Sequence, residues 1–188
     1  NNALPEVAIF FPGEPRAEVV DDAKCSNCHE FLVFHRGVRN DAQFCHTCHN
    51  ADLAAREGSQ SVSLLYLGHS IHTAQAEGFE GVTYPGRISN CLGCHTEDSY
   101  YSARETARAV STVTNDEFLW NDDVATSTTS FACATCHSDQ TAQNHMTQNG
   151  GIFDAAKTEP QLGAETCSIC HGPGGIADVG EVHNVQEL

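Results

Sequence analysis

One short motif, Cys-x-x-Cys-His, occurs five times in this chain and restricts its fold more than any other feature. The copies lie at residues 25–29, 45–49, 91–95, 133–137 and 167–171, and together they contain all ten cysteines. The stretches between them differ in length, which indicates a recurring site rather than the fixed-period units of a solenoid. Any fold of this chain must therefore build five small sites of the same kind.

This motif is the attachment signature of c-type haem. Its two cysteines bond covalently to one porphyrin edge, and the adjacent His binds iron from one side. Zinc sites and disulfide frameworks also use closely spaced cysteines, but neither requires a His after every second cysteine. We therefore predict five covalently bound c-type haems. Their attachment residues are Cys25, Cys28, His29; Cys45, Cys48, His49; Cys91, Cys94, His95; Cys133, Cys136, His137; and Cys167, Cys170, His171.

The remaining histidines predict the second iron ligand of each haem. The chain has eleven histidines, so six remain after the five in the ligand position of the motifs. His46 lies between the two cysteines of its own motif, and we expect it to face solvent; binding to a neighbouring haem is the alternative. The other five are the predicted distal ligands: His35, His69, His72, His145 and His183.

Two of these positions carry more information. His69 and His72 are three residues apart, so on a helix they share one face and can serve two adjacent haems; a separate metal site is the alternative. Met146 follows His145 and is expected to pack in the core rather than to bind iron.

Large apolar side chains are scarce, with one Trp, one Met, four Tyr and nine Phe among 188 residues. A core made of these alone would be thin, and five macrocycles would supply the missing buried surface.

Short helical patterns occur at 52–57, 61–76, 102–110 and 141–148. Residues 4–11 predict a strand or an extended lead-in, and 121–130 a surface loop. The expected fold is mainly α with extensive loops and little β structure, around a core of packed haems. Residues 1–24 form a lead-in segment and 25–188 one pentahaem domain.

The charge balance, 9 Lys and Arg against 25 Asp and Glu, disfavours nucleic acid and anionic membranes as partners. No stretch has the length of a transmembrane helix. No signal peptide is recognised, so we expect a mature protein or a piece of a longer one. Covalent haem attachment implies an extracytoplasmic location, at the cell surface or outside the cell first and in the periplasm second. Bis-His ligation and the net charge of −16 predict low reduction potentials.

Several segments together resemble the outer-membrane multihaem cytochromes of metal-reducing bacteria, the OmcA/MtrC family. They are the paired motifs of residues 25–50 with His35 between them, GHSIH at 68–72, TYPGRISNCLGCH at 83–95, CATCHSDQTAQNHMTQNGGIF at 133–153 and GEVHN at 180–184. Members of this family are typically decahaem, with two pentahaem domains alternating with β-barrel domains. This chain resembles one pentahaem domain, without the barrels or the other five haems.

The resemblance implies extracellular electron transfer, with metal oxides, chelated metals, flavins or other multihaem cytochromes as partners. A compact chain of this length has a radius of gyration on the order of 16 Å, so five haems must lie close together. We therefore predict an electron carrier rather than an enzyme. Two alternatives are a self-associating subunit of a conductive cytochrome filament and a multihaem reductase with one open-site haem.

Overall fold

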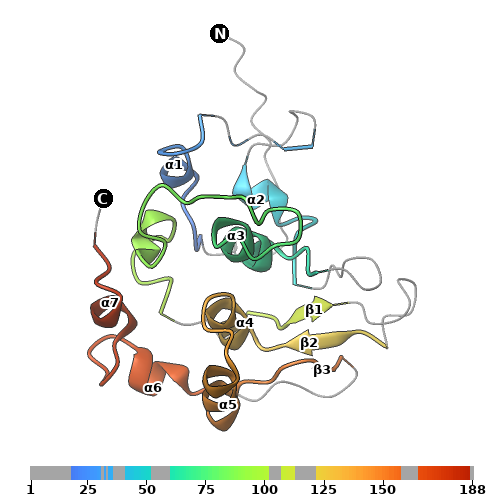
Figure 1. Ribbon diagram of the computed structural model, residues 1–188, viewed down its shortest axis with the longest axis vertical. Helices are drawn as coiled ribbons and strands as arrows, with labels where there is room; N and C mark the ends of the chain where they lie inside the picture. The colour runs from blue at the N-terminus through green and yellow to red at the C-terminus, as the bar shows by residue number, and fades with distance from the viewer. Residues whose placement is uncertain are drawn as a thin grey trace, which may run out of the picture.

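The computed structural model describes residues 18–30, 32, 34–35, 41–51, 60–101, 107–112, 122–157 and 165–186. Short helices joined by turns dominate this part of the chain (Figure 1). The helices are α1 (Asp22–Cys25), α2 (Ala42–Cys45), α3 (Leu64–His72), the 3₁₀ helix η1 (Cys91–Gly93), α4 (Thr128–Ala134), α5 (Gln140–Gln148), α6 (Cys167–His171) and α7 (Val179–Val182). The strands are β1 (Val110–Thr112), β2 (Val124–Thr126) and β3 (Ala155–Ala156).

Helix α3 lies at the centre of the molecule, with α1 and α2 on one side and α4 followed by α5 on the other (Figure 1). The ring of Tyr66 on α3 packs against Phe131 on α4, with 5.5 Å between the ring centroids. The small sheet flanks α4 on one side, and α6 and α7 lie on the opposite side (Figure 1). Within the described residues, no helix has both the length and the apolar character needed to cross a membrane.

The sheet was not anticipated in the sequence, and two expectations about it were wrong. Strands β1, β2 and β3 pair antiparallel in that order, with Val110 opposite Thr126 and Ala125 opposite both Ser111 and Ala155. Residue 110, expected at the end of a helix, therefore lies in a strand. The expected surface loop at 121–130 contains β2 and the start of α4, and Thr126, Ser127 and Ser130 are buried. Internal hydrogen bonds satisfy these hydroxyl-bearing residues, so a polar composition did not mean exposure.

The helix expected at 141–148 is confirmed as α5, which Asp139 caps by accepting hydrogen bonds from the backbone N–H groups of Thr141 and Ala142. The pattern at 61–76 gives the shorter α3, because Ala74 has a φ of 59°, in the left-handed region that ends helices. The expectations for 4–11, 52–57 and the first part of 102–110 lie outside the described residues.

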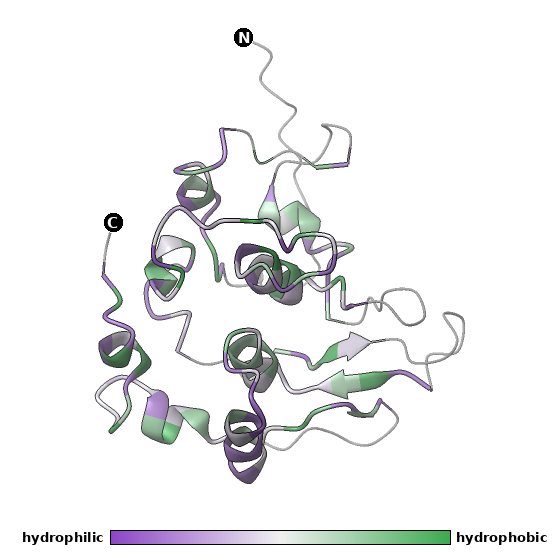
Figure 2. Cartoon of the chain, viewed as in Figure 1, coloured by the Kyte–Doolittle hydropathy of each residue, from purple (hydrophilic) through white to green (hydrophobic). Residues whose placement is uncertain are grey.

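The side-chain core is as thin as the composition suggested. In the described part of the chain only four apolar residues are buried, and all are small: Ala42, Ala76, Val110 and Ala125. Hydrophobic segments are short and scattered over the elements rather than joined in one layer (Figure 2). Ile169 and Ile176 are 75% and 93% exposed. Among the described residues, these two side chains therefore lack a protein partner that would bury them.

Candidate haem-binding sites

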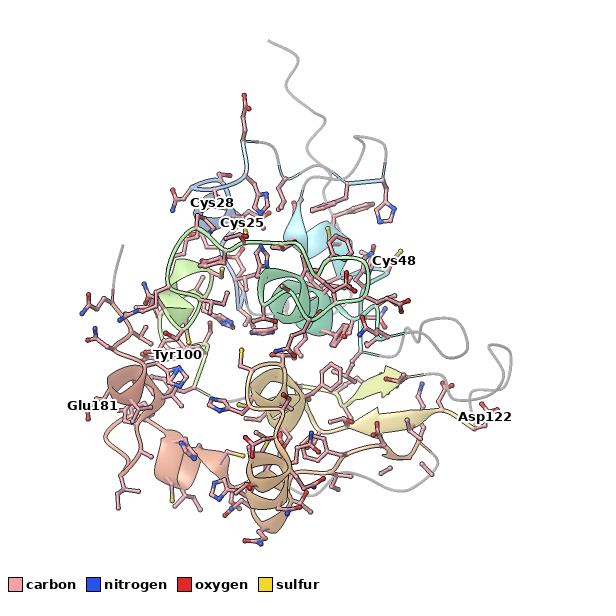
Figure 3. All side chains as sticks on the ribbon, viewed as in Figure 1. Cys25, Cys28, Cys48, Tyr100, Asp122 and Glu181 are labelled. Carbon is pink, nitrogen blue, oxygen red and sulfur yellow. The ribbon has the colours of Figure 1, made fainter. Side chains whose placement is uncertain are left out.

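Each Cys-x-x-Cys-His motif is wound into a single turn. In four of them the N–H of the histidine donates to the carbonyl of the first cysteine at 2.8–2.9 Å, and in the fifth the whole motif is helix α6. Such a turn fixes both cysteines and the histidine relative to one another. Cys25 and Cys28 belong to α1 and the turn after it, and Cys48 to the turn after α2 (Figure 3).

The imidazole of every motif faces the imidazole of one predicted distal histidine. The ring centroids are 5.9–6.1 Å apart in all five pairs, which are His29 with His72, His49 with His35, His95 with His69, His137 with His183, and His171 with His145. These ten residues are the predicted iron ligands. His46, the eleventh histidine, belongs to none of the five pairs.

The separation within each pair fits one metal ion between the two rings. A metal–imidazole bond is about 2 Å long and the ring centre lies about 1 Å beyond the nitrogen, so two rings on opposite sides of one ion have centroids about 6 Å apart. Direct stacking or edge contact between two rings would not require the same centroid separation in all five pairs. The donor set therefore fits haem iron with two axial imidazoles, although ligation itself stays a prediction.

Hydrogen bonds at the other ring nitrogen favour the same arrangement. The Nδ1–H groups of His49, His69 and His72 donate to backbone carbonyls at 2.6–2.7 Å, and that of His171 donates to the Ala177 carbonyl at 3.0 Å. Since a carbonyl can only accept, Nδ1 carries the proton and Nε2 keeps its lone pair. Such partners hold an imidazole in the orientation and tautomer that metal binding needs.

Three of the paired histidines are also kept neutral by their surroundings. Burial, together with the neighbouring His69 and Lys24, lowers the pKa of His95 to about 4. Burial also lowers the pKa of His69 and, with His137 and Arg87, that of His183. Neutral imidazole is the form that binds a metal.

The motifs are not adjacent in space in their sequence order. The first motif contacts the third: the N–H of Asp21 donates to the Cys94 carbonyl at 3.0 Å, and Val20 forms a β-bridge with His95. Helix α3 joins the same two motifs, because its His72 faces the first and its His69 the third. The two sites therefore share one helix face, as the His-x-x-His spacing predicted.

The other motifs extend this contact path in both directions. Asn90, the residue before Cys91, exchanges two hydrogen bonds with Gln186, three residues after His183, and His183 faces His137 of the fourth motif, so the third and fourth sites adjoin. Glu165, two residues before Cys167, accepts hydrogen bonds from the N–H groups of Thr129 and Ser130 in the helix that carries Cys133, so the fourth motif lies by the fifth. The second motif adjoins the first, because the Asp22 carboxylate accepts from the N–H of Ala42 at 3.0 Å. The spatial order is thus second, first, third, fourth, fifth.

The zinc and disulfide alternatives gain no support. All ten cysteines lie among the described residues, and none is in a disulfide bond. Within those residues, no group of three or more His, Cys, Asp or Glu side chains is arranged to hold a metal ion. The sites are pairs of imidazoles, which suits haem because the porphyrin supplies the other four iron ligands.

The structure also adds residues that sequence reasoning missed. The ammonium of Lys24 donates to the carbonyls of Leu92 and His95, at 3.0 and 2.7 Å. The Glu165 carboxylate accepts four hydrogen bonds from the start of α4. The Asp178 carboxylate caps α7, which leads to His183, and accepts from the Tyr101 hydroxyl at 2.9 Å. The partners of Lys24 and Glu165, and Tyr101 as a partner of Asp178, are distant in sequence, so no local pattern revealed these contacts.

Comparisons with known proteins show the family and the fold of this chain. The model of the family described as "outer membrane cytochrome MtrC/MtrF-like, domains II/IV" matches residues 17–184. Among solved structures, the chain is similar to the crystal structure of the outer membrane decahaem cytochrome OmcA, with a TM-score of 0.61 and 24% identity. That match covers 90% of this chain but 26% of OmcA, so the chain spans about a quarter of its relative. No curated protein sequence matches.

Proposed function

Because this chain belongs to the MtrC/MtrF-like family of outer-membrane cytochromes, in the part that forms domains II and IV, we propose that it relays electrons through five bis-histidine haem sites. The observation that carries the proposal is the set of five imidazole pairs, each about 6 Å across and each made of one motif histidine and one predicted distal histidine. Membership in the family already makes the protein a multihaem cytochrome. What we propose beyond this is the number of haems and the identity of their ligands.

In this proposal the ten cysteines hold the cofactors and the ten paired histidines provide their axial ligands. Bound haem supplies a reversible one-electron couple between ferric and ferrous iron. The motif turns fix the five motif imidazoles, and Nδ1 hydrogen bonds hold those of His69 and His72, so these ligands need little rearrangement when charge changes. The haems would also bury the apolar surface that the thin side-chain core leaves uncovered.

The contact path between the motifs suggests the order of the relay. The sites adjoin one another from the second motif through the first, third and fourth to the fifth. Each motif histidine has its own distal partner, which favours relay over a reductase with one open iron position. We therefore propose a carrier rather than an enzyme.

The proposed setting is the cell surface, where the family is found, with electrons passing to metal oxides, chelated metals, flavins or other multihaem cytochromes. The net charge of −16 supports a water-facing surface and cationic or mineral-bound partners over nucleic acid. The chain corresponds to a quarter of OmcA, so the partners of a larger assembly belong to the proposal as well.

Intact-mass measurement combined with optical and electron paramagnetic resonance spectra tests the proposal. The expected result is a mass that exceeds the polypeptide by five haems, with every haem low-spin. A mass that shows four or fewer haems would refute the count. A high-spin component in the native protein would instead point to an open iron site and to catalysis.

A further inference from the structure

We propose that Lys24 and Glu165 are fixed charges of opposite sign that set different reduction potentials along the relay. Lys24 raises the potential at the site of the third motif, and Glu165 lowers it at the sites of the fourth and fifth. The inference rests on the proposed function, since it requires haem at these motifs.

Lys24 places its positive charge on the third motif although it belongs to the helix of the first. Its Nζ donates to the carbonyls of Leu92 and His95, at 3.0 and 2.7 Å, and both bonds are partly buried. The second of these carbonyls belongs to His95, the motif histidine itself, so the charge lies directly beside this site. Partial burial reduces screening by salt. A nearby cation favours the ferrous state, which carries one positive charge fewer.

Glu165 places a negative charge between the fourth and fifth motifs. It lies two residues before Cys167 and reaches the start of α4, the helix that carries Cys133. Its oxygens accept from Ser127 Oγ, Ser130 Oγ and the N–H groups of Thr129 and Ser130, all at 2.7–2.8 Å. Burial would raise the pKa of Glu165, but these bonds outweigh it and hold the pKa below its usual range. The residue is therefore an anion at neutral pH.

The Glu165 charge reaches both neighbouring motifs. Burial is the main reason why the pKa values of the Cys133 and Cys167 thiols are raised, and the negative charge of Glu165 raises them further. An anion favours the ferric state, so Glu165 should lower the reduction potential that Lys24 raises at its own site. Asp22 near the first motif and Arg87 near His183 carry charges of their own, and both remain in every variant below. Each substitution therefore reports the charge that it removes.

The expected size follows from Coulomb's law. At a separation of about 10 Å and an effective dielectric constant of about 20, one unit charge changes the ferric-to-ferrous ratio on the order of tenfold. For a one-electron couple, a tenfold change is about 59 mV. Two opposite charges on neighbouring parts of the path would make the third site the more easily reduced one and would hold electrons there.

Spectroelectrochemical titration of the haem-loaded full chain tests this. In Lys24→Met, about one haem in five should titrate at lower potential. At a fixed potential, its ferric-to-ferrous ratio should rise on the order of tenfold. Glu165→Gln should move up to two in five to higher potential. Lys24→Arg keeps the charge and should titrate as the native protein does. Two further controls remove charges directly after and directly before β3, Lys157→Met and Asp154→Asn, and should shift nothing.

Native mass and spin state are measured first, so that a missing haem refutes the proposed function and not this inference alone. With five low-spin haems present, unchanged titrations, or shifts of the same sign in Lys24→Met and Glu165→Gln, overturn the inference. A high-spin signal in either variant would mean that the residue positions a ligand instead of setting a potential, and also overturns it. Loss of haem loading in both variants would assign them to the fold and would have the same consequence.

Discussion

Replacing Glu165 by Ala should destabilise the protein, because this side chain caps a helix from a distance. Helix α4 begins after Ser127, whose own side chain makes no capping hydrogen bond. The Glu165 carboxylate instead accepts from the N–H groups of Thr129 and Ser130 and from two serine hydroxyls. Negative charge at a helix N-terminus is also favourable to the helix dipole. One residue thus replaces a local cap and joins α4 to the fifth motif.

The magnitude follows from these contacts. Loss of a helix cap costs about 1 kcal/mol, and a hydrogen bond to a charged group contributes about 1.5–3 kcal/mol. The four bonds share one half-buried carboxylate and are partly screened, so their contributions do not add. We expect the free energy of unfolding to fall by about 2–4 kcal/mol at neutral pH. For a chain of this size that lowers Tm by about 5–15 °C.

The loss should depend on pH in a defined direction. Hydrogen bonding holds the pKa of Glu165 in the folded protein below its ordinary value of 4.5. Its contribution is therefore fully present above about pH 4.5 and disappears as the pH falls through the folded-state pKa. Thermal unfolding of the haem-loaded protein, followed by far-ultraviolet circular dichroism at several pH values, measures it. Glu77→Ala, an exposed carboxylate after α3, is the control. The reasoning would be refuted if Glu165→Ala did not lower the free energy of unfolding at pH 7, or lowered it just as much in strong acid.

Three further predictions concern ligands, packing and maturation. His72→Ala should convert one haem of five to high spin, whereas His46→Ala should leave the low-spin spectrum intact; a high-spin signal from the His46 variant would overturn the ligand assignment. Gly151→Ala should destabilise by about 1–3 kcal/mol in denaturant titrations, because a Cβ there would meet Ser130 Oγ and the Met146 carbonyl, while Gly81→Ala, with open space around it, should cost far less. Expression in a host without machinery for attaching haem should give an unfolded chain by circular dichroism, and a folded, soluble apoprotein would contradict a haem-filled core.

The sequence alone predicted the chemistry of the sites, because that chemistry is local. Two cysteines and a histidine within five residues specify haem attachment wherever the motif lies in a fold. Counting also selected the set of distal histidines that the structure brings to the motifs, and the His69–His72 spacing predicted a shared helix face. Helix α5 was predictable for the same reason, since its pattern and its Asp139 cap are adjacent in the chain.

The tertiary structure decided which sites meet, because pairing depends on contacts between distant segments. His145 follows the fourth motif in sequence but faces His171 of the fifth, and His183, near the end of the described chain, faces His137 of the fourth. The order of the motifs in space differs from their order in sequence because the first motif contacts the third, through Asp21 and Val20. The sheet escaped prediction because its strands have only two or three residues, so only pairing with distant partners makes them strands. Lys24 and Glu165 are ordinary charged residues in the sequence, and only the folding of one motif against another gives them buried partners.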